Sequence, residues 1–291
     1  MKIDFSGAEL FLKHLEGEVE LGQVLDSLPY QIIFQHAHHY GSQLSYQDVE
    51  EAISGETTFF YGLDSLEERL NDIENLMEYI VVNEEEWLVQ LEEYYNDFLP
   101  KEDISDITIY PVIGYDPGIG FSKTVCMNLN YHRFFTNPGE FFYILVHEVF
   151  HVIYEQIHPI PSMSQLLIPA DWLSFFKMVA HNEGFAVYMP LAFREEDKFL
   201  EDSDYRILSD QKRLIEYIRL FKDTLELLET GPELSIREYS EHVFGVNRLT
   251  YRIGCELIRR IEAQFGIDAV RDAVYLSGEE FIDNYIYLLD D

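Results

Sequence analysis

The sequence predicts a mostly α-helical protein with a small antiparallel β-sheet, an α+β class in the order helices, sheet, helices. Three observations predict it: acid-rich helical sequence over residues 1–100, two β-prone runs within 101–136, and long helical patterns after that. The chain has 291 residues, of which 47% are hydrophobic and 15% aromatic. It can therefore bury a sizeable core, as one large domain or two closely packed ones.

Residues 1–100 carry two predicted helix starts. Ser45 followed by Asp48 supplies a capping hydroxyl and an acid in the first turn. Asn83 precedes three glutamates, which suggests a second start, and Pro100 ends the helix that follows.

The segment 101–136 has a different character. Residues 107–112 and 124–130 are β-prone, and the stretch 115–120 between them has the composition of a turn. Two such runs around a Gly/Pro turn predict a small antiparallel sheet.

A predicted buried helix follows. Asn137, Pro138 and Glu140 resemble a helix start, and the next residues, FFYILVHEVFHVIYEQIH, are apolar on nearly every face. Further helical patterns cover about 170–193, 204–230 and, in pieces, 235–289, with breaks near Gly231, Gly245, Gly266 and Gly278.

The charge balance limits the partners. The chain has 54 acidic against 20 basic residues, a formal net charge of -34. Such a surface repels nucleic acid and anionic membranes, and we favour solvated helical faces as its main explanation. The N-terminus lacks a signal-peptide pattern, no apolar run reaches the roughly 20 residues of a membrane span, and Cys126 and Cys255 form no disulfide framework. We therefore expect a soluble, cytoplasmic protein with buried cysteines.

The chemistry-bearing motif is His147-Glu148-Val149-Phe150-His151, an H-E-x-x-H sequence inside the apolar helix. Residues four apart lie on one helix face, so His147 and His151 can bind one metal ion. Glu148 can then take a proton from a water whose pKa the metal lowers toward about 7. The alternative is a pair of hydrogen-bonded core histidines. We favour the metal site, because two histidines and an acid are costly inside an apolar helix without partners.

A catalytic zinc site needs a third protein ligand, for which there are three candidates. His158 lies seven residues after His151, but the metzincin pattern has its histidine six residues after and a glycine between. Asp171 opens the next helix without further motif. Glu183, in His-Asn-Glu-Gly-Phe-Ala, is the best candidate, since the small Gly184 and Ala186 would let its helix approach the motif helix closely.

H-E-x-x-H followed on a later helix by E-G-x-A resembles the gluzincin clan of zinc metallopeptidases, over residues 107–193. The resemblance implies a zincin-like core, one zinc ion held by His147, His151 and Glu183, and Glu148 as general base. It also implies an edge strand that pairs with an extended peptide, for which 124–130 is the natural choice.

Two features depart from well-known members of the clan. Val187 stands where thermolysin-like members carry an Asp that orients a His ligand, and the upstream G-x-M-E-N signature of aminopeptidases is absent. The chain therefore resembles an outlying branch, in which Asn182 and Glu155 are candidates for orienting the ligands.

Stabilisation of the oxyanion usually requires a side-chain donor besides the metal. Tyr251, ahead of Gly254 on a late helix, is the first choice, with His181, Tyr188 and His242 as alternatives.

His36, His38 and His39 form a second histidine cluster. Their spacing suits one helix face poorly, so a helix C-terminus favoured by the helix dipole is the preferred interpretation over a second metal site.

These observations predict a zinc metallopeptidase that hydrolyses a peptide or small protein substrate. We expect residues 1–100 to form a lid or wall of the cleft and 101–291 to form the catalytic region. The alternative function is a catalytically silent metal-binding or peptide-binding scaffold.

Overall fold

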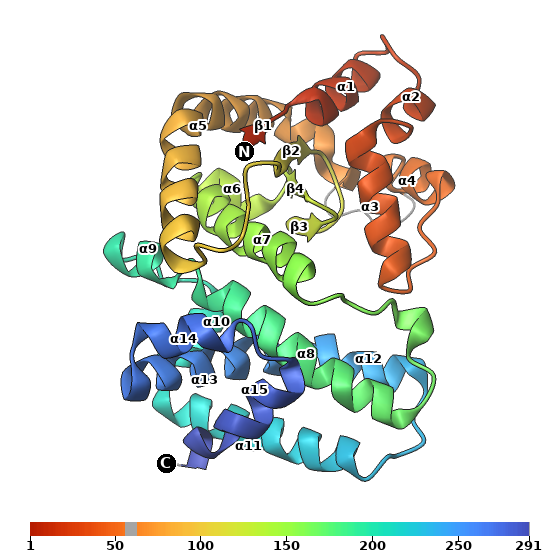
Figure 1. The fold of residues 1–291 in the computed structure, drawn as a ribbon. Helices are drawn as coiled ribbons and strands as arrows, with labels where there is room; N and C mark the ends of the chain where they lie inside the picture. The colour runs from red at the N-terminus through yellow and green to blue at the C-terminus, as the bar shows by residue number, and fades with distance from the viewer. Residues whose placement is uncertain (56–62, 291) are drawn as a thin grey trace. The chain divides into compact units, whose positions relative to one another are not determined.

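The computed structural model describes residues 1–55 and 63–290. The chain forms two compact units, Met1–Glu155 and Gln156–Asp291 (Figure 1). The predicted class, mostly α with a small sheet, is confirmed. The boundary between the units falls near the end of the motif helix. The expected roles of 1–100 and 101–291 stay predictions.

The first unit contains all four strands of the described chain. Its elements are β1 (Lys2–Ile3), α1 (Ser6–Leu15), α2 (Leu21–Leu25), α3 (Leu28–His39), α4 (Tyr46–Ile53), the 3₁₀ helix η1 (Leu63–Arg69), α5 (Leu70–Phe98), β2 (Thr108–Val112), β3 (Gly118–Phe121), β4 (Thr124–Asn128), α6 (His132–Thr136) and α7 (Glu140–Ile157).

The sheet is mixed, with the strand order β1-β2-β4-β3. The two β-prone runs expected to pair antiparallel are β2 and β4, and this expectation is wrong, because β2 runs parallel to both β1 and β4. The antiparallel pair is β3 with β4. β2 and β4 match the two β-prone runs. β3 lies in the stretch whose composition predicts a turn. Glycine has a low strand propensity, so the two glycines of β3 give no local signal for a strand.

One predicted helix start is confirmed and one is wrong. Ser45 and Asp48 form a reciprocal capping box at α4. Asn83 lies inside α5, where its side-chain amide donates to the carbonyl of Tyr79, 2.7 Å away. Helical spacing of buried apolar residues continues on both sides of Asn83, from Ile73 to Tyr95, and this packing outweighs the local cap signal.

The motif helix α7 begins as predicted and is largely buried. The Asn137 side chain accepts a hydrogen bond from the Gly139 N–H, and the helix starts at Glu140. Tyr95 of α5 donates its hydroxyl to the Val146 carbonyl at 2.5 Å, which ties the middle of α7 to α5.

Among its described residues, the regular elements of the second unit are all helices. Its elements are η2 (Met163–Gln165), α8 (Pro169–Tyr188), α9 (Leu191–Glu196), α10 (Ser203–Ser209), α11 (Gln211–Glu229), α12 (Ile236–Phe244), α13 (Leu249–Phe265), α14 (Ile267–Ala273), α15 (Gly278–Tyr285) and η3 (Ile286–Asp290).

The centre of this unit is the crossing of α8 and α13, with α11, α12 and α15 packed around it (Figure 1). The helix expected over 204–230 is divided into α10 and α11, because the Asp210 carboxylate accepts the backbone N–H groups of Lys212 and Arg213 and caps α11. Gly231 has a left-handed φ of 65° and ends that helix as predicted.

Both cysteines are buried free thiols, as expected. Across the part of the chain that the structure describes, none of the helices combines the length and the apolar character that crossing a membrane requires.

Candidate metal centre

The two motif histidines converge on one point. His147 and His151 lie one turn apart on α7, and their Nε2 atoms are 3.0 Å from each other. Their ring centroids are 4.7 Å apart at an interplanar angle of 81°. Both rings therefore direct the same nitrogen toward a common position, which is the arrangement that two imidazole ligands of a single cation require.

Glu148 lies against the edge strand β3. Its side chain is only 7% exposed. A Cβ on Gly118 would lie 2.7 Å from Glu148 Cγ and 2.9 Å from Oε1. A Cβ on Gly120 would lie 2.1 Å from the Glu148 carbonyl oxygen and 2.9 Å from His151 Cβ. Only glycine lets the strand backbone come this close to the motif helix.

The charge of Glu148 affects several neighbours. Burial and then the charge of Glu148 raise the pKa of Asp116, which lies two residues before β3, to about 6. Burial, and to a smaller extent Glu148, also raises the pKa of the Tyr95 hydroxyl and of the Cys126 thiol. The charge of Glu148 therefore acts on three titratable groups around it.

The expected edge strand is corrected from 124–130 to β3. β4 lies between β2 and β3, so both of its sides are paired. The Asn128 N–H donates to the Pro117 carbonyl, 3.0 Å away, which fixes the phase of the antiparallel ladder. By alternation, the backbone groups of Ile119 and Phe121 face β4, and those of Gly118 and Gly120 face the side that no other described strand occupies.

Glu155 holds the β3–β4 hairpin onto α7. Its Oε2 accepts the Ser122 N–H at 2.7 Å. Ser122 and Lys123 have φ values of 51° and 62°, the left-handed pair of a tight hairpin turn. The hydrogen bond from Ser122 to Glu155 thus positions the edge strand. The other candidate for orienting a ligand, Asn182, is 5% exposed on α8.

Glu183 belongs to the second unit, on α8. A Cβ on Gly184 would lie 2.5 Å from the Gly254 carbonyl carbon, and a Cβ on Gly254 would lie 2.0 Å from the Ala180 carbonyl oxygen. The small residue beside Glu183 was expected to admit the motif helix. It admits α13, whose backbone touches α8 at this point. The crossing fixes Glu183 relative to α13.

Two other ligand candidates have structural roles. His158 Nε2 lies 2.7 Å from the Val274 carbonyl oxygen, at the C-terminal end of α14. The Asp171 carboxylate accepts the backbone N–H groups of Leu167 and Ile168 and so caps α8.

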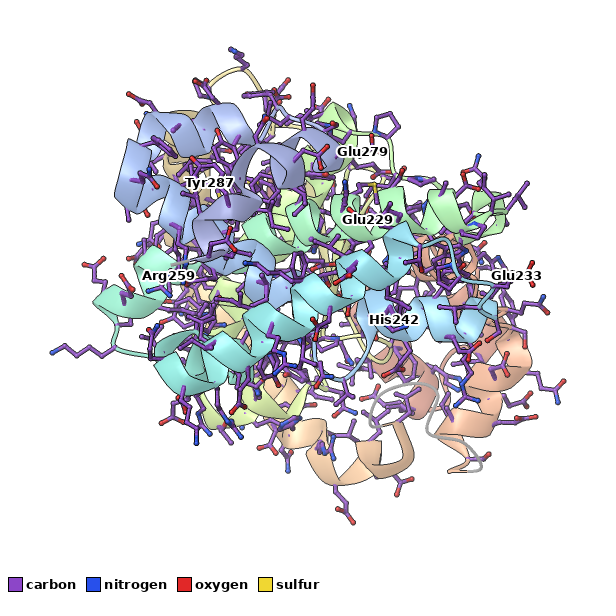
Figure 2. All side chains as sticks on the ribbon, turned by 90° about the horizontal axis from the view of Figure 1, so that it is seen from below. Glu229, Glu233, His242, Arg259, Glu279 and Tyr287 are labelled. Carbon is purple, nitrogen blue, oxygen red and sulfur yellow. The ribbon has the colours of Figure 1, made fainter. Side chains whose placement is uncertain are left out.

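The candidates for oxyanion donor lie on three helices of the second unit. Tyr251 is on α13, with the Arg248 guanidinium 3.6 Å above its ring centroid. Tyr188 donates to Glu262 at 2.8 Å. His181 Nε2 lies 3.0 Å from the Ala273 carbonyl oxygen, and burial followed by the neighbouring His158 lowers its pKa to about 3. His242 is on α12 (Figure 2).

The second histidine cluster ends α3, as the preferred interpretation predicts. His36 Nδ1 lies 3.2 Å from the Tyr115 hydroxyl, and His38 Nε2 lies 3.2 Å from the Leu44 carbonyl oxygen. The His39 ring packs edge-on against Phe121. These rings have separate partners, and among the described residues the groups able to hold a metal do not include them.

A comparison with protein families gives one match. The family model described as "Putative zinc dependent peptidase (DUF5700)" matches residues 23–288. The chain belongs to this family. The match runs from α2 to η3 and so includes both units. No curated protein and no solved structure matches the chain.

The family description agrees with the predicted class of protein, a zinc-dependent peptidase. The DUF5700 description assigns no residues, so the roles in this chain stay predictions. Sequence reasoning missed the glycine contacts of β3 and Asp116 in the first unit, and Arg248 beside Tyr251 in the second. The Asp-Pro-Gly-Ile-Gly stretch carries a signal for the first two, since alternate glycines in a strand mark close backbone approach.

Proposed function

We propose that this protein hydrolyses peptide bonds at one zinc ion held by His147, His151 and Glu183, with Glu148 as general base. These three side chains could together hold a metal ion. Two imidazoles and a carboxylate are the ligand set of many catalytic zinc sites, and they leave a fourth position open.

The observation that carries this proposal is the 3.0 Å approach of the two Nε2 atoms beside Glu148. Two neutral imidazoles in such contact form at most one hydrogen bond with each other. A cation between them would instead be bound by the Nε2 lone pair of each ring. The buried helix around them is apolar, so the donor set fits a zinc ion better than it fits a packed core.

A bound zinc ion would supply Lewis acidity, lowering the pKa of an attacking water and polarising the peptide carbonyl. Glu148 then accepts the proton of that water and passes it to the leaving amine. Tyr251 is the proposed donor to the developing oxyanion.

The proposed substrate is an extended peptide paired with β3. Gly118 and Gly120 offer outward backbone N–H and carbonyl groups next to Glu148. Main-chain pairing of this kind gives affinity with little dependence on the peptide's side chains. Substrate selection would then come from groups beyond the strand.

The decisive experiment is Glu148→Gln. Removing the base at constant shape should lower peptide hydrolysis at least about 100-fold, with about one zinc per chain retained. Cleavage of a quenched fluorescent peptide library and elemental analysis measure the two quantities. Glu229→Gln, at an exposed site at the end of α11 (Figure 2), is the matched control and should change neither.

Undiminished hydrolysis by Glu148→Gln would overturn the assigned mechanism. Stoichiometric zinc without cleavage of any library member by the wild type would instead support the silent scaffold. Zinc that survives His147→Ala and His151→Ala would place the ion elsewhere.

A further inference from the structure

Arg248 is a cation in contact with the proposed oxyanion donor Tyr251, and the proposed mechanism gives it no role. It immediately precedes α13, with a left-handed φ of 46°, and its backbone N–H donates to the Gly245 carbonyl at 2.7 Å. A non-glycine residue in this conformation costs about 1 kcal/mol or more and persists where the surrounding structure requires it.

Asp204 fixes one edge of the guanidinium. Arg248 Nε lies 3.2 Å and 3.0 Å from the two Asp204 oxygens, and Nη2 lies 3.0 Å from Oδ2. Asp204 is 4% exposed and also accepts a hydrogen bond from Arg252 Nε at 2.8 Å. Two guanidinium groups around one carboxylate leave this cluster with a net positive charge.

The opposite edge of the guanidinium is available. Arginine has two bidentate edges, Nε with Nη2 and Nη1 with Nη2, and Asp204 occupies the first. In residues 1–55 and 63–290, Nη1 has no hydrogen-bond partner, and the side chain is 38% exposed. The face of the guanidinium rests on the Tyr251 ring, so the open edge is held in a fixed direction.

The charges of two groups of the proposed site act on this cation. Besides Asp204, the charges that act on Arg248 come from Tyr251 and Glu183. The guanidinium is therefore in contact with the proposed oxyanion donor, and the charge of the proposed third ligand acts on it. Its fork geometry matches a planar carboxylate.

We propose that the Nη1 edge of Arg248 binds a carboxylate of the peptide substrate. This inference rests on the proposed function for its substrate class. The carboxylate is either the C-terminal one or that of an Asp or Glu side chain. In a chain with a net charge of -34, a fixed guanidinium would select anionic groups that the rest of the surface repels.

The test compares pairs of peptides that differ in one carboxylate. In the first pair, one peptide has a free C-terminal carboxylate and the other has an amidated C-terminus. In the second pair, both C-termini are amidated, and one peptide has an internal Asp where the other has Asn. For the wild type, one pair should show a kcat/KM preference for the carboxylate of about 10-fold or more. Arg248→Met should bring that ratio near 1, and Arg248→Lys should lower it partially, because lysine keeps the charge without the fork.

The matched control is Arg259→Met. Arg259 pairs with Glu256 at 3.2 Å, has a side-chain exposure of 40%, and lies on α13, the helix that Arg248 precedes (Figure 2). This variant should keep the wild-type ratio. An unchanged ratio in Arg248→Met, equal losses for both members of a pair, or no carboxylate preference in either pair would overturn the proposal.

Direct binding separates this proposal from the proposed function. If no peptide is cleaved, N-acetyl-dialanine and its amide are titrated into the full-length zinc-loaded protein by calorimetry. Tighter binding of the acid, lost in Arg248→Met and partly kept in Arg248→Lys, supports the carboxylate site without hydrolysis. Equal affinities for acid and amide, together with equal affinities for an amidated peptide with internal Asp and its Asn counterpart, overturn it.

Discussion

The two units position their candidate functional residues by the same device, a glycine that lets two backbones touch, but in different settings. In the first unit Gly120 brings a four-residue edge strand against α7, beside Glu148. In the second unit Gly254 brings α13 against α8, next to Glu183. An edge strand can move away from its helix, whereas two central helices have neighbours on all sides. The same substitution should therefore have different consequences in the two units.

Gly254→Ala should have the largest effect on stability. Its Cβ would lie 2.0 Å from the Ala180 carbonyl oxygen, a backbone atom in the middle of a buried helix. Overpacking that cannot relax costs about 3 kcal/mol. Chemical denaturation with Trp172 as the fluorescent reporter measures it, in a Trp87→Phe background, because Trp172 belongs to α8 of the same unit. A loss below about 1 kcal/mol would contradict the contact.

Gly22→Ala is the control for this series. Gly22 lies in α2 with no atom within 4 Å of its added Cβ. The alanine should raise stability by about 0.5 kcal/mol through the entropy of the unfolded chain. A loss in this variant would mean that the alanine substitutions act through something other than crowding.

Gly120→Ala should have a smaller effect on stability and a larger one on hydrolysis. The Cβ would meet the Glu148 carbonyl oxygen at 2.1 Å, and β3 can relieve the contact by shifting outward. We expect a loss of about 1–2 kcal/mol, and a fall in kcat/KM of about 10-fold or more because the peptide would move with the strand. Trp87, in a Trp172→Phe background, reports on this unit. An unchanged kcat/KM would mean that β3 does not bind the substrate.

The same contrast explains what could be predicted from sequence. The pair His147 and His151 depends only on helical periodicity, and the structure shows their ring nitrogens converging. The helix and sheet content follows from patterns of similarly short range. By contrast, local composition predicts a turn where β3 lies, and the expected edge strand falls on β4. Their places depend on pairing with β2 and on contact with α7, and no local pattern encodes either.

The second unit shows the same limit for individual residues. The small residue next to Glu183 helps to single it out as a ligand candidate. The same glycine does not specify which helix packs against it, so the expectation that Gly184 contacts the motif helix is wrong: it contacts α13. Arg248 could not be recognised at all. Its significance comes from Asp204, 44 residues earlier in the chain, and from the ring of Tyr251 beneath it.

Asp116 gives the smallest expected effect and concerns the first unit alone. Its folded pKa of about 6 lies above the ordinary value of 3.8, because of burial and the charge of Glu148. Between these values the folded protein binds more protons than the unfolded chain, so the contribution of Asp116 to stability falls as the pH rises from about 4 to about 6. Asp116→Asn removes this fall. Its stability relative to wild type should therefore be higher at pH 7.5 than at pH 4.5.

The pKa of Asp48, in the same unit, is shifted in the opposite direction to that of Asp116. Its hydrogen bonds with Ser45 lower its pKa, so its contribution is present above the ordinary value and is lost as the pH falls through the folded one. Asp48→Asn should therefore destabilise the protein about equally at pH 7.5 and pH 4.5, which both lie above the ordinary value of 3.8, and should destabilise it less below that value. Denaturation at the two pH values, with a chelator present to remove any contribution of zinc, measures both variants. If Asp116→Asn changes the free energy of unfolding equally at both pH values, then burial and Glu148 do not raise the pKa of Asp116 in the folded protein.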